Sequence, residues 1–351
     1  MPNPRTIEWS WDGKPVAIGV DECGRGPGVL LLPALSSIST RAEMRPLAHR
    51  LASVSRVVSV DWPGFGERGR PDVRWTPEAL SRFLDHVLRA VIPDARAVVA
   101  AGHAATYALH HAAHNPGRLD RLALIAPTWR GPLPTMAGGD RPLFGRMRRA
   151  IELPAIGPLL YRANVNPLVV RMMVAGHVYS EPRALSGERL SEKHRVINAP
   201  GARFGSAAFV TGGLDRVASR PEFLALAHRA NVPILLAYGA QTPSKSRAEM
   251  EALARLPGVQ SRVLPKGKLA VHEEYPDEVA RVLIPFLVPA TDHGADGRVS
   301  GQGADTPVAS TREPGGRRDG LPGSVLSRHG WRAFIRTRPG SWPGRDEAWE
   351  R

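Results

Sequence analysis

Residues 97–127 read AVVAAGHAATYALHHAAHNPGRLDRLALIAP, and this stretch decides the fold. It starts with an apolar run of strand length, 97–101, turns at Gly102 and continues into a stretch of helical length, 104–114. A second apolar run follows at 122–126. Two strands joined through a helix in this way lie parallel in one sheet, with the helix packed on a face of that sheet. The stretch therefore predicts a strand–helix–strand unit.

The same alternation extends outward in both directions. Several strand-length runs are wholly apolar, which is typical of parallel strands buried on both faces of a sheet. The sequence thus predicts an α/β fold with a mostly parallel central sheet covered by helices on both faces. The predicted strands are 7–11, 16–20, 29–32, 57–60, 97–101, 122–126, 234–238 and 261–264, and the predicted helices are 42–52, 77–92, 104–114, 246–256 and 278–286.

Two segments depart from this alternation. Residues 129–231 are helical in pattern and rich in proline and arginine, and they lie between two predicted strands. An insertion after the carboxyl end of a strand lies over the ligand crevice of an open α/β sheet, so we expect a helical cap. Residues 290–351 carry few large apolar side chains and predict a disordered low-complexity tail. The core is then formed by 1–128 and 232–289.

The composition excludes several classes of protein. The chain has 351 residues, of which 42% are hydrophobic and 23% charged, as in ordinary globular proteins. No apolar run is long enough to span a membrane, and the first residues lack the apolar region of a secretory signal, so a cytoplasmic location is expected. The single cysteine, Cys23, excludes an internal disulfide and a multi-cysteine metal site. No metal and no cofactor are expected.

The net charge of +14 comes from 47 basic and 33 acidic residues. A protein that binds nucleic acid would concentrate basic residues in a recognisable module, and none is present, so no nucleic-acid partner is expected. The one tight basic cluster has two interpretations, contact with an anionic surface or, preferably, a solvated helix face. Its members are Arg141, Arg146, Arg148 and Arg149.

Five short motifs occur in a familiar order. They resemble motifs of the α/β-hydrolase superfamily: a turn after a strand, a nucleophile elbow, the run that follows the elbow helix, the turn of the triad acid and the run after the triad histidine. In this chain they read Asp61-Trp62-Pro63-Gly64-Phe65-Gly66, Ala101-Gly102-His103, Asn115-Pro116-Gly117-Arg118-Leu119, Tyr238-Gly239-Ala240-Gln241-Thr242-Pro243 and His272-Glu273-Glu274-Tyr275-Pro276.

The resemblance implies a catalytic triad of nucleophile, acid and histidine in that chain order. Matching the motifs places the nucleophile at Ala104, the acid at Thr242 and the histidine at Leu269. None of these residues supplies the chemistry of its position, so a serine-hydrolase mechanism has no basis here. We therefore expect a non-classical or non-catalytic member of the superfamily.

Three residues remain as catalytic candidates, each beside a structural interpretation. His272 lies near the histidine position and is the best candidate for a general base, but a surface histidine at the start of a helix would look the same. His103 precedes the matched nucleophile position, where a packing role is usual. Thr106 carries the only hydroxyl of the elbow, and a hydrogen bond within the first helical turn is the alternative.

Backbone N–H groups survive side-chain changes, so the resemblance still implies an oxyanion site. We expect its donors at Leu35 and Ala105, with Ser36 adding a hydroxyl and Trp129 lining the pocket. The predicted partner is a small hydrophobic ligand, with or without a carbonyl or carboxylate group. Two alternatives stay open: an active hydrolase of ester-like hydrophobic substrates, and a cofactor-free lyase or oxygenase that uses His272.

Overall fold

The computed structural model describes residues 3–181 and 187–288. Within these residues one sheet contains β1 (Asn3–Trp11), β2 (Lys14–Cys23), β3 (Gly28–Leu32), β4 (Arg56–Val60), β5 (Ala95–Ala101), β6 (Arg121–Ile125), β7 (Ile234–Gly239) and β8 (Val259–Leu264). Their order across the sheet is β1-β2-β4-β3-β5-β6-β7-β8. β2 is antiparallel to β1 and β4, and the remaining neighbours are parallel. The predicted mostly parallel sheet is confirmed.

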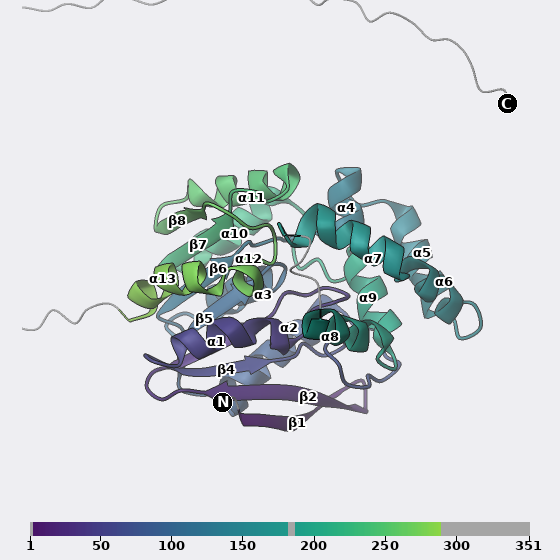
Figure 1. Cartoon of the computed structure of the whole chain (residues 1–351), viewed down its shortest axis with the longest axis horizontal. Helices are drawn as coiled ribbons and strands as arrows, with labels where there is room; N and C mark the ends of the chain where they lie inside the picture. Colours follow the sequence, from purple (N-terminus) through teal and green to yellow (C-terminus); the bar gives the residue numbers. More distant parts are fainter. Residues whose placement is uncertain (1–2, 182–186, 289–351) are drawn as a thin grey trace, which may run out of the picture. The chain divides into compact units, whose positions relative to one another are not determined.

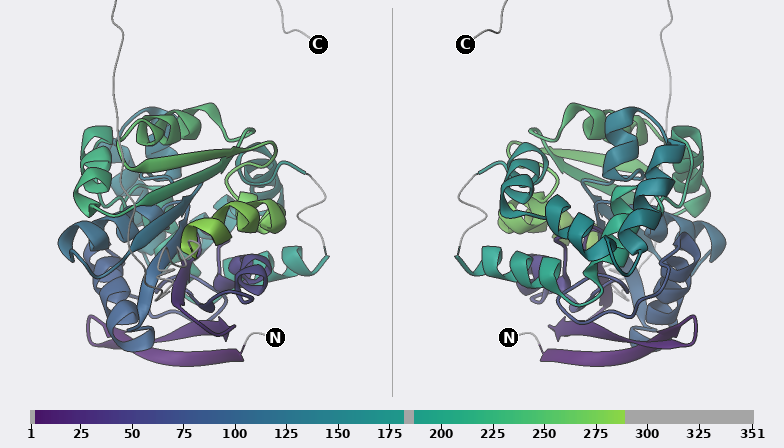
Figure 2. Two further views of the ribbon diagram at one scale, coloured as in Figure 1. Left: turned by 90° about the vertical axis from the view of Figure 1, so that its left-hand side faces the viewer. Right: turned by 90° about the vertical axis from the view of Figure 1, so that its right-hand side faces the viewer.

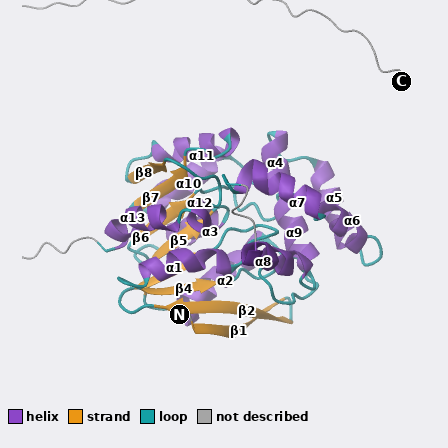
Figure 3. Cartoon of the chain, viewed as in Figure 1, coloured by secondary structure: helices purple, strands orange, loops and turns teal. Residues whose placement is uncertain are grey.

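Helices cover both faces of this sheet (Figures 1 and 3). Alternate residues of a strand point to opposite faces, so Leu30 belongs to one apolar core and Val29 to the other. The antiparallel β1–β2 hairpin lies at one edge of the sheet (Figure 2). The Leu30 face is covered by α2 (Pro77–His86), α3 (Ala104–His114), α10 (Arg220–Ala230) and α11 (Ser244–Ala254), and the Val29 face by α1 (Arg45–Leu51) and α13 (Pro276–Leu287).

Two predicted helices change geometry along their length. The predicted helix 42–52 starts as a 3₁₀ turn, Arg41–Met44, before α1 begins. α2 begins where predicted because the Thr76 hydroxyl accepts a hydrogen bond from the N–H of Ala79 at 3.2 Å. Its continuation, Val87–Val91, is a π-helical turn. These changes affect only the ends of elements and leave the order of the layers as predicted.

A run of helices separates β6 from β7. It comprises α4 (Pro132–Ala137), α5 (Pro142–Glu152), α6 (Gly157–Asn164), α7 (Pro167–Met173), the π-helix η3 (Val174–Val178), α8 (Gly187–Asn198) and α9 (Ala202–Val210). Figure 1 shows α4 to α7 and α9 grouped to one side of the sheet. α10 also lies inside the range predicted for the cap, but it packs on α3 in the layer that covers the sheet. The predicted tail, 290–351, lies outside the described residues.

Candidate functional site

The loops after β3, β5, β6 and β8 meet the insertion around a cavity of about 100 Å³. The carboxyl ends of parallel strands are where open α/β sheets bind ligands, so this cavity is the candidate site. It is lined from the sheet side by Ala34, Leu35, Ser36, Ile38, Ser39, Glu43, Gly102, His103, Thr128, Leu269, Ala270, His272 and Glu273, and from the insertion by Val178, Tyr179, Lys193 and Phe209.

Gly102 forms the sharp turn between β5 and α3. Its φ of +52° lies in the left-handed region, which favours glycine. A Cβ atom at this position would lie 3.0 Å from the Cβ of Ala34, closer than ordinary van der Waals contact. Matching the motifs placed the nucleophile at Ala104, but Ala104 is a fully buried residue of α3 and does not line the cavity. The strained turn falls two residues earlier, and it carries no side chain.

The motifs match Thr242 to the triad acid and Leu269 to the triad histidine. Thr242 is buried, and its hydroxyl has no hydrogen-bond partner in the part of the chain that the structure describes. Leu269 lines the cavity, and its N–H donates to the backbone oxygen of His177 at 3.3 Å. The N–H of Ala270 donates in the same way to Val178 at 3.0 Å. The loop that would carry a catalytic histidine is therefore tied to the insertion and presents an apolar side chain.

His103 is buried at the start of α3. Its Nε2 lies 3.1 Å from the backbone oxygen of Leu214 and 3.4 Å from the nearer carboxyl oxygen of Asp215. Burial lowers the pKa of His103 to about 4, although the hydrogen bond to Leu214 acts in the opposite direction. Burial likewise raises the pKa of Asp215 to about 8, against the N–H of Gly131, which donates to it at 2.8 Å. His103 is thus neutral and anchored to the backbone, with Nδ1 unpartnered among the described residues.

The hydroxyl of Thr106 donates to the backbone oxygen of Thr128 at 3.2 Å and does not reach the cavity. This corrects the candidate role of Thr106 as a nucleophile. The N–H of Ala105 donates to the backbone oxygen of Gly102 at 3.3 Å, which corrects its predicted role as an oxyanion donor. The corresponding free donor is the N–H of His103, the residue after the turn.

Leu35 and Ser36 lie where the sequence predicted them, at the wall of the cavity. Among the described residues, no protein acceptor pairs with the N–H of Leu35 or of His103. The hydroxyl of Ser36 accepts from the N–H of Ile38 at 3.2 Å and lies 3.0 Å from the hydroxyl of Ser39, so it serves the loop. Two backbone N–H groups of the cavity wall are therefore available to an oxygen atom of a ligand.

A buried charged cluster, which the sequence analysis did not predict, forms the opposite wall. Lys193 of α8 lies 3.1 Å from a carboxyl oxygen of Glu273 and 3.6 Å from one of Glu43, and all three side chains are almost fully buried. The hydroxyl of Tyr179 donates to Glu273 at 2.6 Å. The other carboxyl oxygen of Glu43 accepts from the N–H of Ala34 at 2.7 Å. Residues far apart in the sequence thus form one ionic network.

The pKa values in this cluster favour its charged forms. Burial alone would lower the pKa of Lys193, but Glu273, Tyr179 and Glu43 outweigh burial and raise it. Burial would raise the pKa of Glu43, yet His272, Lys193 and the N–H of Ala34 together lower it. Lys193 and Glu43 are therefore paired ions between α8 and the core.

His272 belongs to the short helix α12 (Val271–Glu274) and is buried at the cavity wall, not exposed at a helix start. Its Nε2 lies 3.5 Å from a carboxyl oxygen of Glu43, at the limit of a hydrogen bond. Neither ring nitrogen has a closer partner among the described residues. Of the three catalytic candidates, His103 and His272 each line the cavity and lie beside a carboxylate. His272 differs in that its ring is not hydrogen-bonded to a backbone oxygen of the described residues, whereas the His103 ring contacts that of Leu214.

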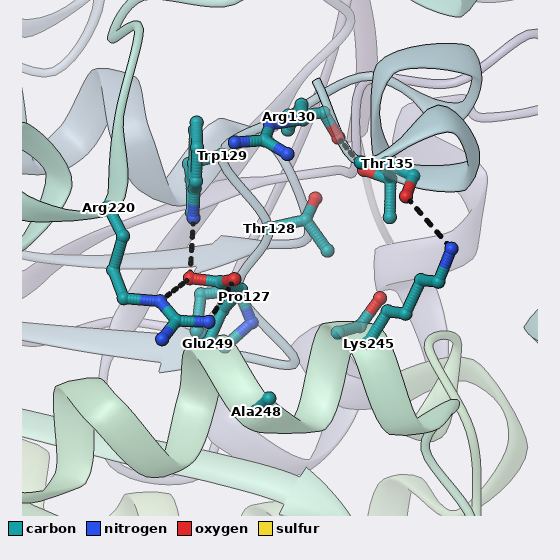
Figure 4. A pocket seen from close by; sticks show the side chains of 11 residues that line it. Pro127, Thr128, Trp129, Arg130, Thr135, Arg220, Lys245, Ala248 and Glu249 are labelled. Atoms are coloured by element: carbon teal, nitrogen blue, oxygen red, sulfur yellow. Dashed lines mark hydrogen bonds and ion pairs between the residues drawn. The ribbon is translucent and has the colours of Figure 1, made fainter.

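A second, larger cavity of about 270 Å³ lies between the loop after β6 and α11 (Figure 4). Trp129 lines this cavity and not the one beside Gly102, which corrects its predicted place. The indole N–H of Trp129 donates to Glu249 at 3.0 Å, and Arg220 pairs with the same carboxylate at 2.8 and 2.7 Å. Thr128 lines both cavities.

Within residues 3–181 and 187–288, no group of three or more His, Cys, Asp or Glu side chains is placed to hold a metal ion. No helix of these ranges has the length and apolar character needed to cross a membrane.

Comparison with known proteins agrees with the observed fold. Residues 29–282 match the model of the alpha/beta hydrolase family, and the chain belongs to that family. No curated protein matches the sequence significantly.

Solved structures show the same fold at low identity. A thermophilic esterase from Thermogutta terrifontis is 22% identical, and the match covers 81% of this chain and 98% of the esterase chain with a TM-score of 0.62. The Cif epoxide hydrolase from Acinetobacter nosocomialis is 16% identical, with 81% and 89% covered and a TM-score of 0.62. The haloalkane dehalogenase DatA from Agrobacterium tumefaciens C58 is 21% identical, with 81% and 96% covered and a TM-score of 0.58.

Proposed function

We propose that this protein binds a small, largely apolar ligand under its helical cap and does not carry out acyl or alkyl transfer. The observation that carries the proposal is the turn at Gly102, where the nucleophile of an α/β hydrolase would stand. The residue has no side chain, and the methyl group of Ala34 fills the adjacent space. With Leu269 and Thr242 at the other two positions, no group remains to form or release a covalent intermediate.

The cavity wall defines the ligand class. Leu35, Ile38, Phe209 and Leu269 supply apolar surface, and the N–H groups of Leu35 and His103 have no acceptor among the described residues. A carbonyl or carboxylate oxygen would satisfy these donors, as it does in an oxyanion hole. A cavity of about 100 Å³ admits only a small molecule. The cap assigned to residues 129–231 would cover this ligand, because Val178, Lys193 and Phe209 close the cavity from above.

One specific observation favours a second candidate function. The His272 ring lies 3.5 Å from the Glu43 carboxylate in the same cavity as Gly102. A histidine oriented by a carboxylate is the arrangement of a general base. It would suit cofactor-free proton abstraction next to a carbonyl, as in a lyase or oxygenase, whose enolate oxygen the free N–H groups would hold.

The test restores the missing groups. Wild-type protein is expected to hydrolyse neither p-nitrophenyl acetate nor p-nitrophenyl butyrate and to remain unlabelled by a fluorophosphonate probe. The variant Ala34→Gly/Gly102→Ser/Thr242→Asp/Leu269→His is expected to gain labelling. The matched control replaces Gly102→Ser by Ala104→Ser in the same background, and it should stay unlabelled because position 104 is buried in α3.

Three outcomes would contradict the proposal. The first is ester turnover or fluorophosphonate labelling of the wild-type protein. The second is labelling of the Ala104→Ser control but not of the Gly102→Ser variant. The third is native mass spectrometry that finds no copurified small molecule, together with turnover of a carbonyl compound that His272→Gln abolishes, which would establish the second candidate instead.

A further inference from the structure

The exposed apolar side chains of this protein are concentrated in one part of the insertion. Ten large apolar side chains of the described residues are exposed, and eight of them belong to α4, α5, α6, α7 and the α5–α6 loop. These eight are Met136, Leu143, Met147, Leu153, Ile156, Leu159, Leu160 and Met172. Scattered exposed apolar residues are normal in proteins, but a concentration of this kind marks an interaction surface.

The apolar side chains follow one another along the helices. On α5, Leu143 and Met147 are one turn apart and exposed, and they flank the buried Phe144. The loop that leads to α6 is exposed at both Leu153 and Ile156. On α6, Leu159 is 71% exposed although α5 and α6 pack against each other. The surface formed by α5, the loop and α6, residues 142–164, is named here the α5–α6 surface.

Arginines surround these apolar side chains. Arg141, Arg146, Arg149 and Arg162 are exposed, and none of their guanidinium groups pairs with a carboxylate of the described residues. The acidic residue of the α5–α6 surface, Glu152, pairs with Arg148 at 3.8 Å. Exposed leucines bordered by unpaired arginines are the composition of helices that lie in the interface of a membrane. This composition favours the other interpretation of the arginine cluster, contact with an anionic surface.

We propose that the α5–α6 surface docks this protein on an anionic phospholipid bilayer. The apolar side chains enter the boundary between headgroups and acyl chains, and the arginines bind lipid phosphates. The charge argues against a second copy of this chain as the occupant, because a two-fold contact through this surface would bring two sets of four exposed arginines into one interface. This proposal does not rest on the function proposed for the cavity.

Vesicle flotation with the full chain tests the proposal. Binding is expected to vesicles of phosphatidylcholine with 30% phosphatidylglycerol, to weaken as NaCl is raised, and to be much weaker to phosphatidylcholine alone. Arg146→Gln/Arg149→Gln is expected to weaken binding by about thirtyfold, since each basic residue near the surface contributes roughly a factor of five. Leu143→Gln/Leu159→Gln should weaken it by at least about tenfold through lost apolar burial.

Matched controls separate this surface from general charge and hydrophobicity. Val263→Gln replaces an apolar residue of β8 that is as exposed, at 55%, as Leu143 at 56%. Arg247→Gln/Arg255→Gln removes the same charge from α11. Both controls should bind like the wild type, and all variants should keep its thermal unfolding midpoint.

Four results would overturn the proposal. The first is absence of binding to the phosphatidylglycerol vesicles, and the second is a loss of binding in the control variants equal to that in the test variants. The third is binding to polyglutamate but not to vesicles, which would indicate an acidic protein partner. The fourth is a dimer in sedimentation that Leu143→Gln/Leu159→Gln dissociates.

Discussion

The two walls of the cavity treat buried ionisable groups in opposite ways. On the Gly102 side, burial dominates: the pKa of His103 falls to about 4 and that of Asp215 rises to about 8, so both groups are neutral near pH 7. On the Glu43 side, pairing dominates: the pKa of Glu43 is lowered and that of Lys193 is raised, so both are charged. Burial removes a charge unless an opposite charge is in contact with it.

Under the proposed function, the two walls also differ in the reactive side chains that they carry. The wall that contains Gly102 and Leu269 carries no nucleophile and no histidine at the two positions that we propose correspond to those of the triad. The wall formed by Glu43, Lys193 and Glu273 carries charges that the triad does not require. The two walls can be challenged separately, and the predictions below are ordered by the size of the expected effect.

The largest effect is expected for Lys193→Met. Removing the ammonium leaves Glu43 and Glu273 buried without their shared partner, and breaking a buried pair in this way costs about 3–5 kcal/mol of the free energy of unfolding. Urea denaturation followed by circular dichroism measures this loss. Lys245→Met, at an exposed lysine, should change stability by less than about 0.5 kcal/mol. Equal effects of the two substitutions would show that the network does not hold α8 to the core.

The second prediction concerns the neutral wall and pH. The folded state keeps a proton on Asp215 up to about pH 8, whereas the unfolded state releases it near pH 4. The unfolded state therefore binds fewer protons over this range, and stability decreases as the pH rises. Relative to Asp215→Asn, the wild type should lose on the order of 2–4 kcal/mol between pH 5 and pH 8.

Asp120→Asn is the control for this experiment, because Asp120 is a surface residue paired with Arg96 at 2.8 Å. It should keep the pH dependence of the wild type. If the stability of Asp215→Asn and of the wild type decreases in parallel with pH, Asp215 is ionised in the fold and the contrast between the two walls is lost.

The third prediction addresses the turn itself. Gly102→Ala should cost about 1–2 kcal/mol for a left-handed alanine, plus the close contact with Ala34. Gly117→Ala has a φ of +75° but no atom within 4 Å of the new Cβ, so it measures the backbone cost alone. Adding Ala34→Gly should rescue Gly102→Ala by about 0.5–1 kcal/mol and leave Gly117→Ala unchanged. Equal rescue of both variants would mean that the Ala34 methyl does not fill the nucleophile position.

Most of the fold could be predicted from the sequence because each buried strand has its own apolar signal. Residues 97–126 are an example: the apolar run, the glycine and the helical stretch predicted there correspond to β5, the turn at Gly102 and α3. Helix α10 was harder to place, since the insertion and the core layer are equally helical in pattern. Only its packing on α3 assigns it to the core layer.

The site was less predictable, for two physical reasons. Gly102-His103 resembles the first two residues of the elbow motif, so the motif match placed the nucleophile at Ala104, two residues after the turn. A left-handed turn needs glycine, and Gly102 is the glycine of this turn, so the signal was present. In contrast, no local pattern connects Glu43 with Lys193, because their contact joins residues 150 positions apart along the chain. A buried ionic network of this kind exists only in the folded structure.

The smallest effect is expected for Thr242, the residue matched to the triad acid. The buried hydroxyl of Thr242 has no hydrogen-bond partner among the described residues, so Thr242→Val removes an unsatisfied polar group while keeping the shape of the side chain. Stability should rise by roughly 0–1 kcal/mol in urea denaturation. Thr211→Val is the matched control, because the equally buried hydroxyl of Thr211 donates to Ala207 at 2.7 Å; its loss should cost roughly 0.5–1.5 kcal/mol. A loss at Thr242 as large as that at Thr211 would mean that its hydroxyl is satisfied, by a water or by the ligand. Thr242 would then keep a polar role at the position matched to the triad acid. Only Gly102 and Leu269 would then distinguish the wall without reactive side chains from the charged wall.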